Sequence, residues 1–272
     1  MFLFDDPFVD GWIGGHRRPS AVRYPRRATS ALATILIAGH SFAQTAFGEP
    51  IPGDSFGGLL QTEWPGVALS DYVSYGSLQQ IWELNDDLRN SDYDAVIATE
   101  FTSDFVNGFP AIDSDTTRNT LQHLYWAGLT AQDRGAEIIL QDVWSPQGAD
   151  LSENVQGYFQ FLREWLQDKL GQPVWILPAS PFVMALRNEY GDAIYDDGLH
   201  LGRGSRYARA MSYLVYSLLT QERCPFVVEG DEDVDQMAWD TLLACECAGM
   251  GGSIRYPSTS WNDPLPEPAP LA

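Results

Sequence analysis

Short apolar runs alternate with longer amphipathic segments through most of this sequence, and this alternation is the strongest constraint on its fold. The apolar runs cover residues 33–38, 94–99, 137–140 and 173–177, and a further strand is predicted around residues 67–73. Segments of helical periodicity cover residues 77–88, 115–133, 152–170, 182–188 and 203–219. Continuous apolar runs are typical of strands buried on both faces, and helices between successive strands favour parallel pairing. The sequence therefore predicts an α/β fold, with a five-stranded parallel sheet covered by helices on both faces.

Capping residues define the two longest predicted helices. Ser114 or Asp115 is suited to start the helix over 115–133, and Gly135 is suited to end it. Gly171 is placed to end the helix over 152–170 in the same way. After Cys224 the pattern changes: residues 229–235 are an acidic stretch predicted as a solvated turn, and 236–245 are predicted as one helix.

The length of 272 residues fits one large domain with flanking segments. Residues 1–30 mix aromatic, Pro, Gly and Arg residues without periodicity, so they are predicted to form an N-terminal arm. Residues 31–222 hold all the predicted strands and form the main domain. Residues 223–272 are predicted as a C-terminal extension packed on that domain and ending in a disordered Pro-rich tail.

Charge and hydropathy exclude several classes of partner. The net charge of -21 would repel nucleic acid, so no nucleic-acid partner is predicted. No run reaches the roughly 18 to 20 apolar residues of a membrane span, so no transmembrane segment is predicted. An apolar run after Arg26 and Arg27 imitates a secretion signal, but Gly39 and His40 interrupt it. We expect no signal peptide, which favours the cytoplasm, while the localisation and the oligomeric state stay open.

The cysteines do not form a recognisable metal or disulfide framework. Cys224, Cys245 and Cys247 are too few and too late in the chain for a disulfide-rich scaffold. Cys245 and Cys247 form a C-x-C pair without a nearby histidine, which supports a zinc site only weakly. Buried thiols, or one disulfide from Cys224, are the alternatives, and no metal is predicted.

Ser41 is the candidate nucleophile. It follows the first apolar run in Gly39-His40-Ser41. In an open parallel sheet, ligands bind beyond the carboxyl ends of the strands. A serine in that turn exposes its hydroxyl and offers its own backbone N–H to an oxyanion. The alternative role for such a serine is an N-cap of the following helix.

Asp197 and His200 are the candidate acid and base. Asp197-Gly198-Leu199-His200 follows the fifth α/β unit. An acid three residues before a histidine can fold back onto the imidazole Nδ1–H, which leaves Nε2 to face a serine. The alternative is a surface loop whose carboxylate caps the helix that starts near Gly202.

These two motifs together resemble the SGNH or GDSL-type esterases and lipases. The family's first block reads G-D-S where this chain has Gly39-His40-Ser41, and its last block reads D-x-x-H-P where this chain has 197–201. The resemblance covers roughly residues 33–220 and implies a three-layer α/β/α sandwich of the flavodoxin-like type. It also implies Ser41 as nucleophile, His200 as general base and Asp197 as the residue that orients it, with no cofactor.

The resemblance extends incompletely to the oxyanion hole. The family's second block contributes a glycine N–H, for which Gly76 is the best match, beside the N–H of Ser41. The third block reads G-x-N-D in the family, whereas this chain has Ser103 where the asparagine is expected. Losing one oxyanion donor costs roughly 100- to 1000-fold in rate. Ser103 or Asn107 could supply the missing donor.

The resulting hypothesis is a serine esterase that hydrolyses an acetyl or short-acyl ester of a small molecule or a carbohydrate. Aromatic residues such as Trp144 lie near predicted strand ends, where they could line the core or contact an acyl group or sugar. One rival is an O-acyltransferase that uses the same site. The other is a catalytically decayed module that binds a carbohydrate or a partner.

Overall fold

The structure, a computed structural model, describes residues 34–39, 60, 63–64, 68–73, 77–84, 86–100, 110–202, 204–257, 265 and 267–271. Its strands form one parallel sheet in the order β2-β1-β3-β4-β5. They are β1 (Thr34–Gly39), β2 (Ala68–Val73), β3 (Ala95–Ala98), β4 (Glu137–Gln141) and β5 (Trp175–Leu177). The predicted α/β class and the parallel sheet are confirmed.

The register of the sheet brings the strand ends to a common edge. Ala38 near the end of β1 pairs with Tyr72 of β2 and with Ala98 of β3. Leu140 of β4 pairs with Ala98 on one side and with Ile176 of β5 on the other. The carboxyl ends of β1, β3, β4 and β5 therefore lie at one edge of the sheet.

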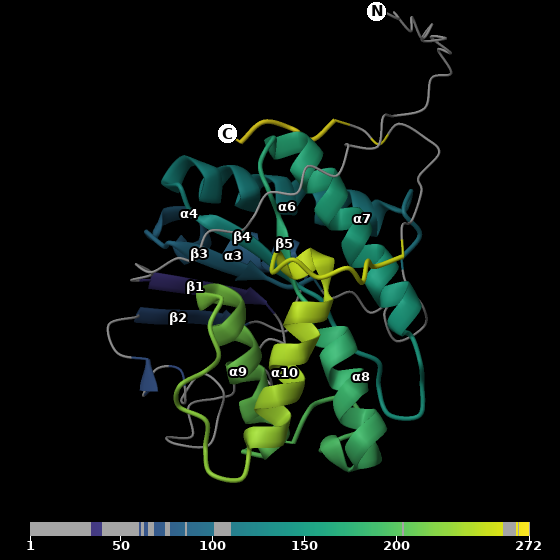
Figure 1. The fold of residues 1–272 in the computed structure, drawn as a ribbon. Coiled ribbons are helices and arrows are strands. Elements are labelled where there is room, and N and C mark those ends of the chain that lie inside the picture. The colour runs from purple at the N-terminus through teal and green to yellow at the C-terminus, as the bar shows by residue number, and fades with distance from the viewer. Residues whose placement is uncertain are drawn as a thin grey trace, which may run out of the picture.

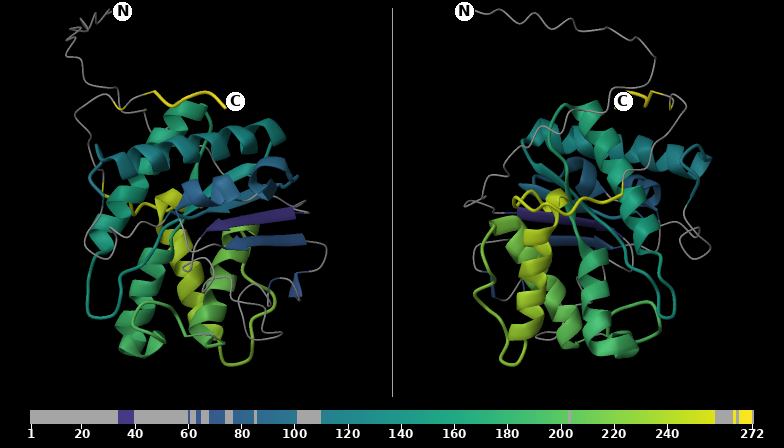
Figure 2. Two further views of the ribbon diagram at one scale, coloured as in Figure 1. Left: turned by 180° about the vertical axis from the view of Figure 1, so that it is seen from behind. Right: turned by 45° about the vertical axis from the view of Figure 1, so that its right-hand side comes forward.

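Helices cover both faces of this sheet (Figures 1 and 2). On one face lie α3 (Leu78–Leu84), α4 (Asp86–Asn90), α6 (Asp115–Arg134) and α7 (Ser152–Leu170). On the other face lie α8 (Ala179–Tyr190), α9 (Arg206–Thr220) and α10 (Glu232–Ala244). Two short 3-10 turns, η1 (Gly191–Ile194) and η2 (Glu246–Ala248), follow α8 and α10.

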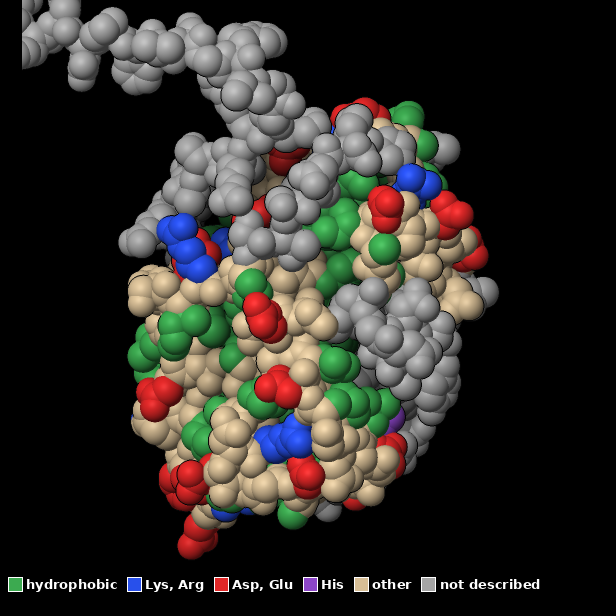
Figure 3. All heavy atoms as spheres, turned by 90° about the vertical axis from the view of Figure 1, so that its right-hand side faces the viewer, with side chains coloured by type: hydrophobic (Ala, Val, Ile, Leu, Met, Phe, Trp, Pro, Cys, Tyr) green, Lys and Arg blue, Asp and Glu red, His purple; other side chains and the backbone are tan. Residues whose placement is uncertain are grey.

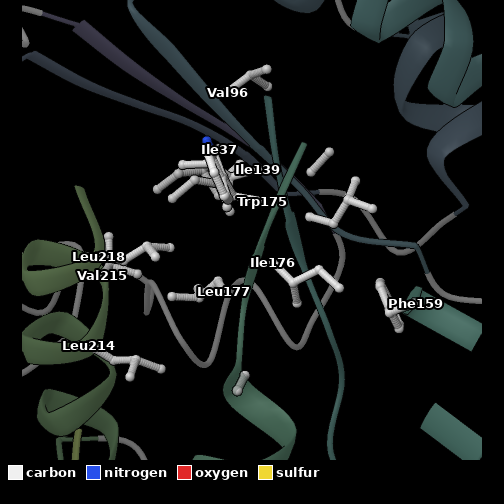
Figure 4. Packing of buried hydrophobic residues seen from close by; sticks show 14 of the residues in the cluster. Ile37, Val96, Ile139, Phe159, Trp175, Ile176, Leu177, Leu214, Val215 and Leu218 are labelled. Carbon is white, nitrogen blue, oxygen red and sulfur yellow. The ribbon is translucent and has the colours of Figure 1, made fainter. Parts of the chain in front are cut away.

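The core has two apolar layers, one on each side of the sheet. Figure 4 shows Leu177 directed toward Leu214 of α9, whereas its neighbour Ile176 is directed toward Phe159 of α7. Successive side chains of a strand alternate between faces, so a strand covered on both sides must be apolar at every position. Each residue of β3 and of β5 is buried, which explains why these segments are continuous apolar runs.

The capping residues lie at the helix ends where the sequence predicts them: Ser114 begins α6, Gly135 ends α6 and Gly171 ends α7. The Ser114 hydroxyl accepts the Thr117 N–H at 3.2 Å at the start of α6, and Gly135 ends α6 with φ at +69°. Gly171 ends α7 with φ at +64°. The helix predicted over 77–88 corresponds to α3 and α4, and residue 85 between them lies outside the described residues.

The acidic segment 229–235 differs from its prediction as a solvated turn. Glu232 starts α10, and the side chains of Asp231 and Asp235 are buried. Asp231 pairs with Arg209 of α9 at 2.8 Å, and Asp235 pairs with Arg223. These arginines compensate the carboxylates, because a buried charge without a partner would be strongly destabilising.

The C-terminal segment packs on several elements. Figure 1 shows α10 beside α9, and η2 contacts β5. Near the end of the chain, Ala269 accepts hydrogen bonds from the side chains of Gln122 and Trp126 on α6. The division into arm, domain and extension stays a prediction.

Acidic side chains are scattered over the surface rather than gathered in one patch on the face seen in Figure 3. Within the ranges given above, no helix has the length and apolarity needed to cross a membrane.

Candidate functional site

The segment that carries Asp197 and His200 is a closed turn. Tyr195 and Leu201 form an antiparallel bridge at its base, and the Asp196 N–H donates to the His200 carbonyl at 2.9 Å. Gly198 at its tip has φ at +81°, in the left-handed region that favours glycine. We call residues 195–201 the histidine hairpin.

One carboxylate organises this hairpin. Asp197 Oδ2 lies 2.7 Å from His200 Nδ1, while Asp197 Oδ1 accepts the backbone N–H groups of His200 at 2.8 Å and Leu199 at 3.0 Å. The contact with the imidazole is the one that the three-residue spacing predicts. With Nδ1–H donating to the carboxylate, Nε2 is the basic nitrogen of the neutral ring. Nε2 itself is shielded from solvent.

These contacts also set the charge of Asp197. Desolvation raises its pKa. The hydrogen bonds from the His200 backbone, the His200 side chain and the Leu199 backbone together lower the pKa by more, so that it falls to about 2. Asp197 is therefore ionised at neutral pH, although its side chain is 57% exposed. A hydrogen bond to an ionised acceptor is stronger than one to a neutral acceptor, so the charge of Asp197 helps to hold the His200 ring in this orientation.

The histidine hairpin is attached to the loop between β4 and α7. Trp144 Nε1–H donates to the Leu199 carbonyl at 2.9 Å, and the Gln147 N–H donates to the Gly198 carbonyl at 2.6 Å. At the base of the hairpin, the Tyr195 hydroxyl donates to the Ser145 carbonyl at 2.9 Å. Because this loop follows the carboxyl end of β4, the hairpin lies at that edge of the sheet.

The ends of β1 and β3 meet at the same edge. The Thr99 N–H donates to the Ala38 carbonyl at 3.0 Å. The next residue, Glu100, is buried, and its two carboxylate oxygens accept the Leu78 N–H at 3.2 and 3.3 Å. Thr99, Glu100 and Leu78 contribute to the wall of a small cavity of about 10 Å³, which has room for about one water molecule.

Only some of the predicted site residues lie in the described part of the chain. The structure brings Asp197 and His200 together, whereas Ser41, Gly76, Ser103 and Asn107 lie outside the described residues. Another histidine, His123, is buried on α6, with Nδ1 2.7 Å from the Asn119 carbonyl. The catalytic roles predicted for Ser41, Asp197 and His200, and the oxyanion roles predicted for Gly76, Ser103 or Asn107, stay predictions.

Sequence reasoning missed the residues that hold the hairpin. Trp144 stood out only as an aromatic residue near a strand end, and it is 2% exposed, so it belongs to the core rather than to an open mouth. Tyr195 and Gln147 carried no signal in the sequence. Their contacts join residues that are about fifty positions apart in the chain, which no local spacing reveals.

The cysteines are separate from the histidine hairpin in the sequence and are free thiols. Cys224, Cys245 and Cys247 are all buried, and none forms a disulfide. In the described part of the chain, no group of three or more His, Cys, Asp or Glu side chains is arranged to hold a metal ion.

Comparisons with known proteins identify relatives of the fold. No protein-family model and no curated protein sequence matches this chain. Among solved structures, a protein of the DUF4886 family from Bacteroides uniformis is similar with a TM-score of 0.55 and 14% identity, over 77% of this chain and 94% of that one. An acetyl xylan esterase is similar with a TM-score of 0.50 and 14% identity, over 68% of this chain and 98% of that one. At these identities, the chain shares a fold with both proteins.

Proposed function

We propose that this protein is a serine esterase of the SGNH type, with a flavodoxin-like three-layer fold. The observation that carries the proposal is the contact of 2.7 Å between Asp197 Oδ2 and His200 Nδ1, in a hairpin at the carboxyl edge of the sheet. β1 ends at Gly39 on the same edge, two residues before Ser41. The similarity in fold to an esterase supports the same proposal.

The proposed reaction proceeds through an acyl-enzyme. His200 Nε2 takes the proton of the Ser41 hydroxyl as Oγ attacks the ester carbonyl carbon. Backbone N–H groups of Ser41 and Gly76, with the Ser103 hydroxyl, stabilise the oxyanion. His200 then gives the proton to the departing alcohol, and afterwards activates a water molecule that releases the carboxylic acid. Asp197 holds the ring and stabilises its positive charge.

The proposed substrate is an ester with an acetyl or short acyl group, and a carbohydrate is a suitable alcohol part. Two arguments support this choice. One of the similar structures is that of an acetyl xylan esterase. The charge of -21 disfavours polyanionic substrates.

The test compares variants on a short-chain aryl ester such as p-nitrophenyl acetate. Ser41→Ala and His200→Ala should each lower kcat by roughly 10⁶-fold, because members of a triad act as a unit. His123→Ala serves as the histidine control and should keep kcat. Circular dichroism of each variant establishes that it is folded.

A fluorophosphonate probe provides a second readout, because it reacts with a serine activated by a histidine. We expect labelling at Ser41 in the wild type and none in His200→Ala. Undiminished turnover in a folded Ser41→Ala variant would reject the serine mechanism. Loss of activity in His123→Ala with His200→Ala unaffected would show that the base is misassigned.

A further inference from the structure

We infer that Trp144 and Tyr195 are positioning residues for His200, and that the loop between β4 and α7 holds the histidine hairpin in its catalytic geometry. This inference rests on the proposed function and adds residues that lie outside the triad. The three hydrogen bonds between the loop and the hairpin support it, since they join its base and its tip to the loop.

The pattern at the tip involves two consecutive peptide groups. In the peptide group that joins Leu199 to His200, the carbonyl accepts from Trp144 Nε1–H and the N–H donates to Asp197. In the preceding peptide group, the Gly198 carbonyl accepts from the Gln147 N–H and the Leu199 N–H donates to Asp197. Each peptide group is thus held on one side by the loop and on the other by the carboxylate.

This arrangement restricts rotation of the backbone next to the imidazole. A peptide group held at its N–H alone can still tilt about the adjacent φ and ψ angles. A second bond at the carbonyl opposes that tilt. Asp197 bonds both to these peptide N–H groups and to Nδ1 of His200. A tilt of the backbone would therefore also move the ring, and with it Nε2 relative to the Ser41 hydroxyl.

The donors come from a rigid part of the molecule. Trp144 is 2% exposed and follows β4 by three residues, so its indole is held by the core. The Tyr195 side chain is partly buried, and its hydroxyl ties the base of the hairpin to Ser145. Catalytic groups supported by packed residues keep their geometry, and a displacement of about 1 Å can cost up to roughly 100-fold in rate.

The test removes single hydrogen-bond donors and keeps an aromatic ring at each position. Trp144→Phe and Tyr195→Phe should each lower kcat by roughly 10-fold, with KM changed by less than about 2-fold, because the contacts act on the base rather than on bound substrate. The rate of fluorophosphonate labelling should fall in parallel with kcat. Amide hydrogen exchange at His200 should become faster in both variants.

Matched controls come from the same residue types elsewhere. Trp126 Nε1–H donates to the Ala269 carbonyl at 2.9 Å, and the Tyr190 hydroxyl donates to Asp233. Trp126→Phe and Tyr190→Phe should keep kcat and the labelling rate, even if their Tm falls as much as that of the site variants. Loss of general stability therefore cannot produce the expected pattern.

The outcomes separate this inference from the proposed function. If Ser41→Ala is inactive while folded Trp144→Phe and Tyr195→Phe keep wild-type kcat and labelling rate, the positioning role is wrong and the esterase proposal stands. If Ser41→Ala keeps full activity, both fail. If Trp144→Phe does not fold, Tyr195→Phe, which loses only a hydroxyl group, decides the question alone.

Discussion

Asp197 makes three hydrogen bonds with one side chain. Oδ1 binds two backbone N–H groups of the hairpin, and Oδ2 binds the imidazole of His200. Since the pKa of Asp197 is lowered to about 2, its stabilising contribution is present above its ordinary value of 3.8 and is lost as the pH falls through about 2. A loss of activity between about pH 7 and pH 5 would therefore not reflect protonation of Asp197.

Removing the acid should cost less than removing the base. We expect Asp197→Ala to lower kcat by roughly 10⁴-fold and His200→Ala by roughly 10⁶-fold, since the orienting acid is the least costly member of a triad to lose. Steady-state kinetics on a short-chain aryl ester measure both. Asp196→Ala, a change at the adjacent carboxylate, is the control and should have a much smaller effect. A larger fall in kcat in Asp197→Ala than in His200→Ala would contradict these roles.

Gly198 is the residue whose backbone angle allows the hairpin to turn. Its φ of +81° is unfavourable for other residues, and an added Cβ would lie 3.3 Å from the side-chain oxygen of Gln147. We expect Gly198→Ala to lower the free energy of unfolding by about 1 to 2 kcal/mol and to lower kcat as well. Urea unfolding and steady-state kinetics measure the two effects.

Gly171→Ala is the control for Gly198→Ala. Gly171 also has a positive φ, +64°, and it has open space around it at the end of α7. It should lose a similar amount of stability and keep kcat. Equal kcat in the two variants would show that the hairpin tolerates a distorted tip.

At the level of elements, Glu100 connects β3 to the start of α3. Its buried carboxylate accepts the Leu78 N–H, and the segment just before Leu78 carries the proposed oxyanion donor Gly76. We expect Glu100→Ala to lower the free energy of unfolding by about 1 to 3 kcal/mol, because a buried N–H loses its acceptor. It should also lower kcat more than it changes KM.

The control for Glu100→Ala is Glu83→Ala. Glu83 is an exposed glutamate on the same helix, where it accepts a hydrogen bond from Gln79 at 2.9 Å. Thermal unfolding and steady-state kinetics on both variants give the comparison. If Glu100→Ala unfolds at the same temperature as Glu83→Ala, the carboxylate does not anchor α3.

The sequence predicted best those elements that depend on local interactions. α6 is bounded by Ser114 and Gly135, and both caps act within a few residues of the chain. α10 begins earlier than predicted, because Asp231 and Asp235 are stabilised by arginines on other segments. Net charge along the chain suggests a solvated turn there, and only the folded arrangement supplies the opposing charges.

The same distinction applies to the candidate site. The contact of Asp197 with His200 spans three residues, so spacing alone predicts it. Trp144 and Leu199 are 55 residues apart, and their contact follows from the way the loop after β4 meets the hairpin. Parallel strands align their carboxyl ends, which predicts the edge where the site lies but not the partners at that edge.

For the molecule as a whole, Asp142 joins the sheet to the C-terminal segment. It follows β4 and is fully buried; Oδ2 accepts the Tyr256 hydroxyl at 2.6 Å and Oδ1 accepts the Ser180 N–H at 2.7 Å. Burial raises the pKa of Asp142 from 3.8 to about 7, against the effect of these hydrogen bonds. The folded protein therefore holds a proton on Asp142 that the unfolded chain releases at a lower pH.

This difference predicts how global stability depends on pH. Because the folded pKa lies above the unfolded value, the contribution of Asp142 is fully present below about pH 4 and is lost as the pH rises through about 7. Asp142→Asn cannot ionise and keeps an acceptor for Ser180. At about pH 8 the variant should avoid a penalty of up to about 4 kcal/mol, given about 1.4 kcal/mol for each pKa unit. Urea unfolding at about pH 4.5 and pH 8 measures the stability difference between variant and wild type.

That difference, rather than the stability of either protein, is the quantity to compare, because the net charge of -21 makes the wild type pH-dependent for other reasons. The stability of Asp142→Asn relative to the wild type should increase as the pH rises. Asp113→Asn, at an exposed position before α6, removes the same charge and should show a much smaller change. Parallel stability curves for Asp142→Asn and the wild type would mean that Asp142 is ionised throughout this range, and that Tyr256 and the N-terminus of α8 stabilise the carboxylate more than burial destabilises it.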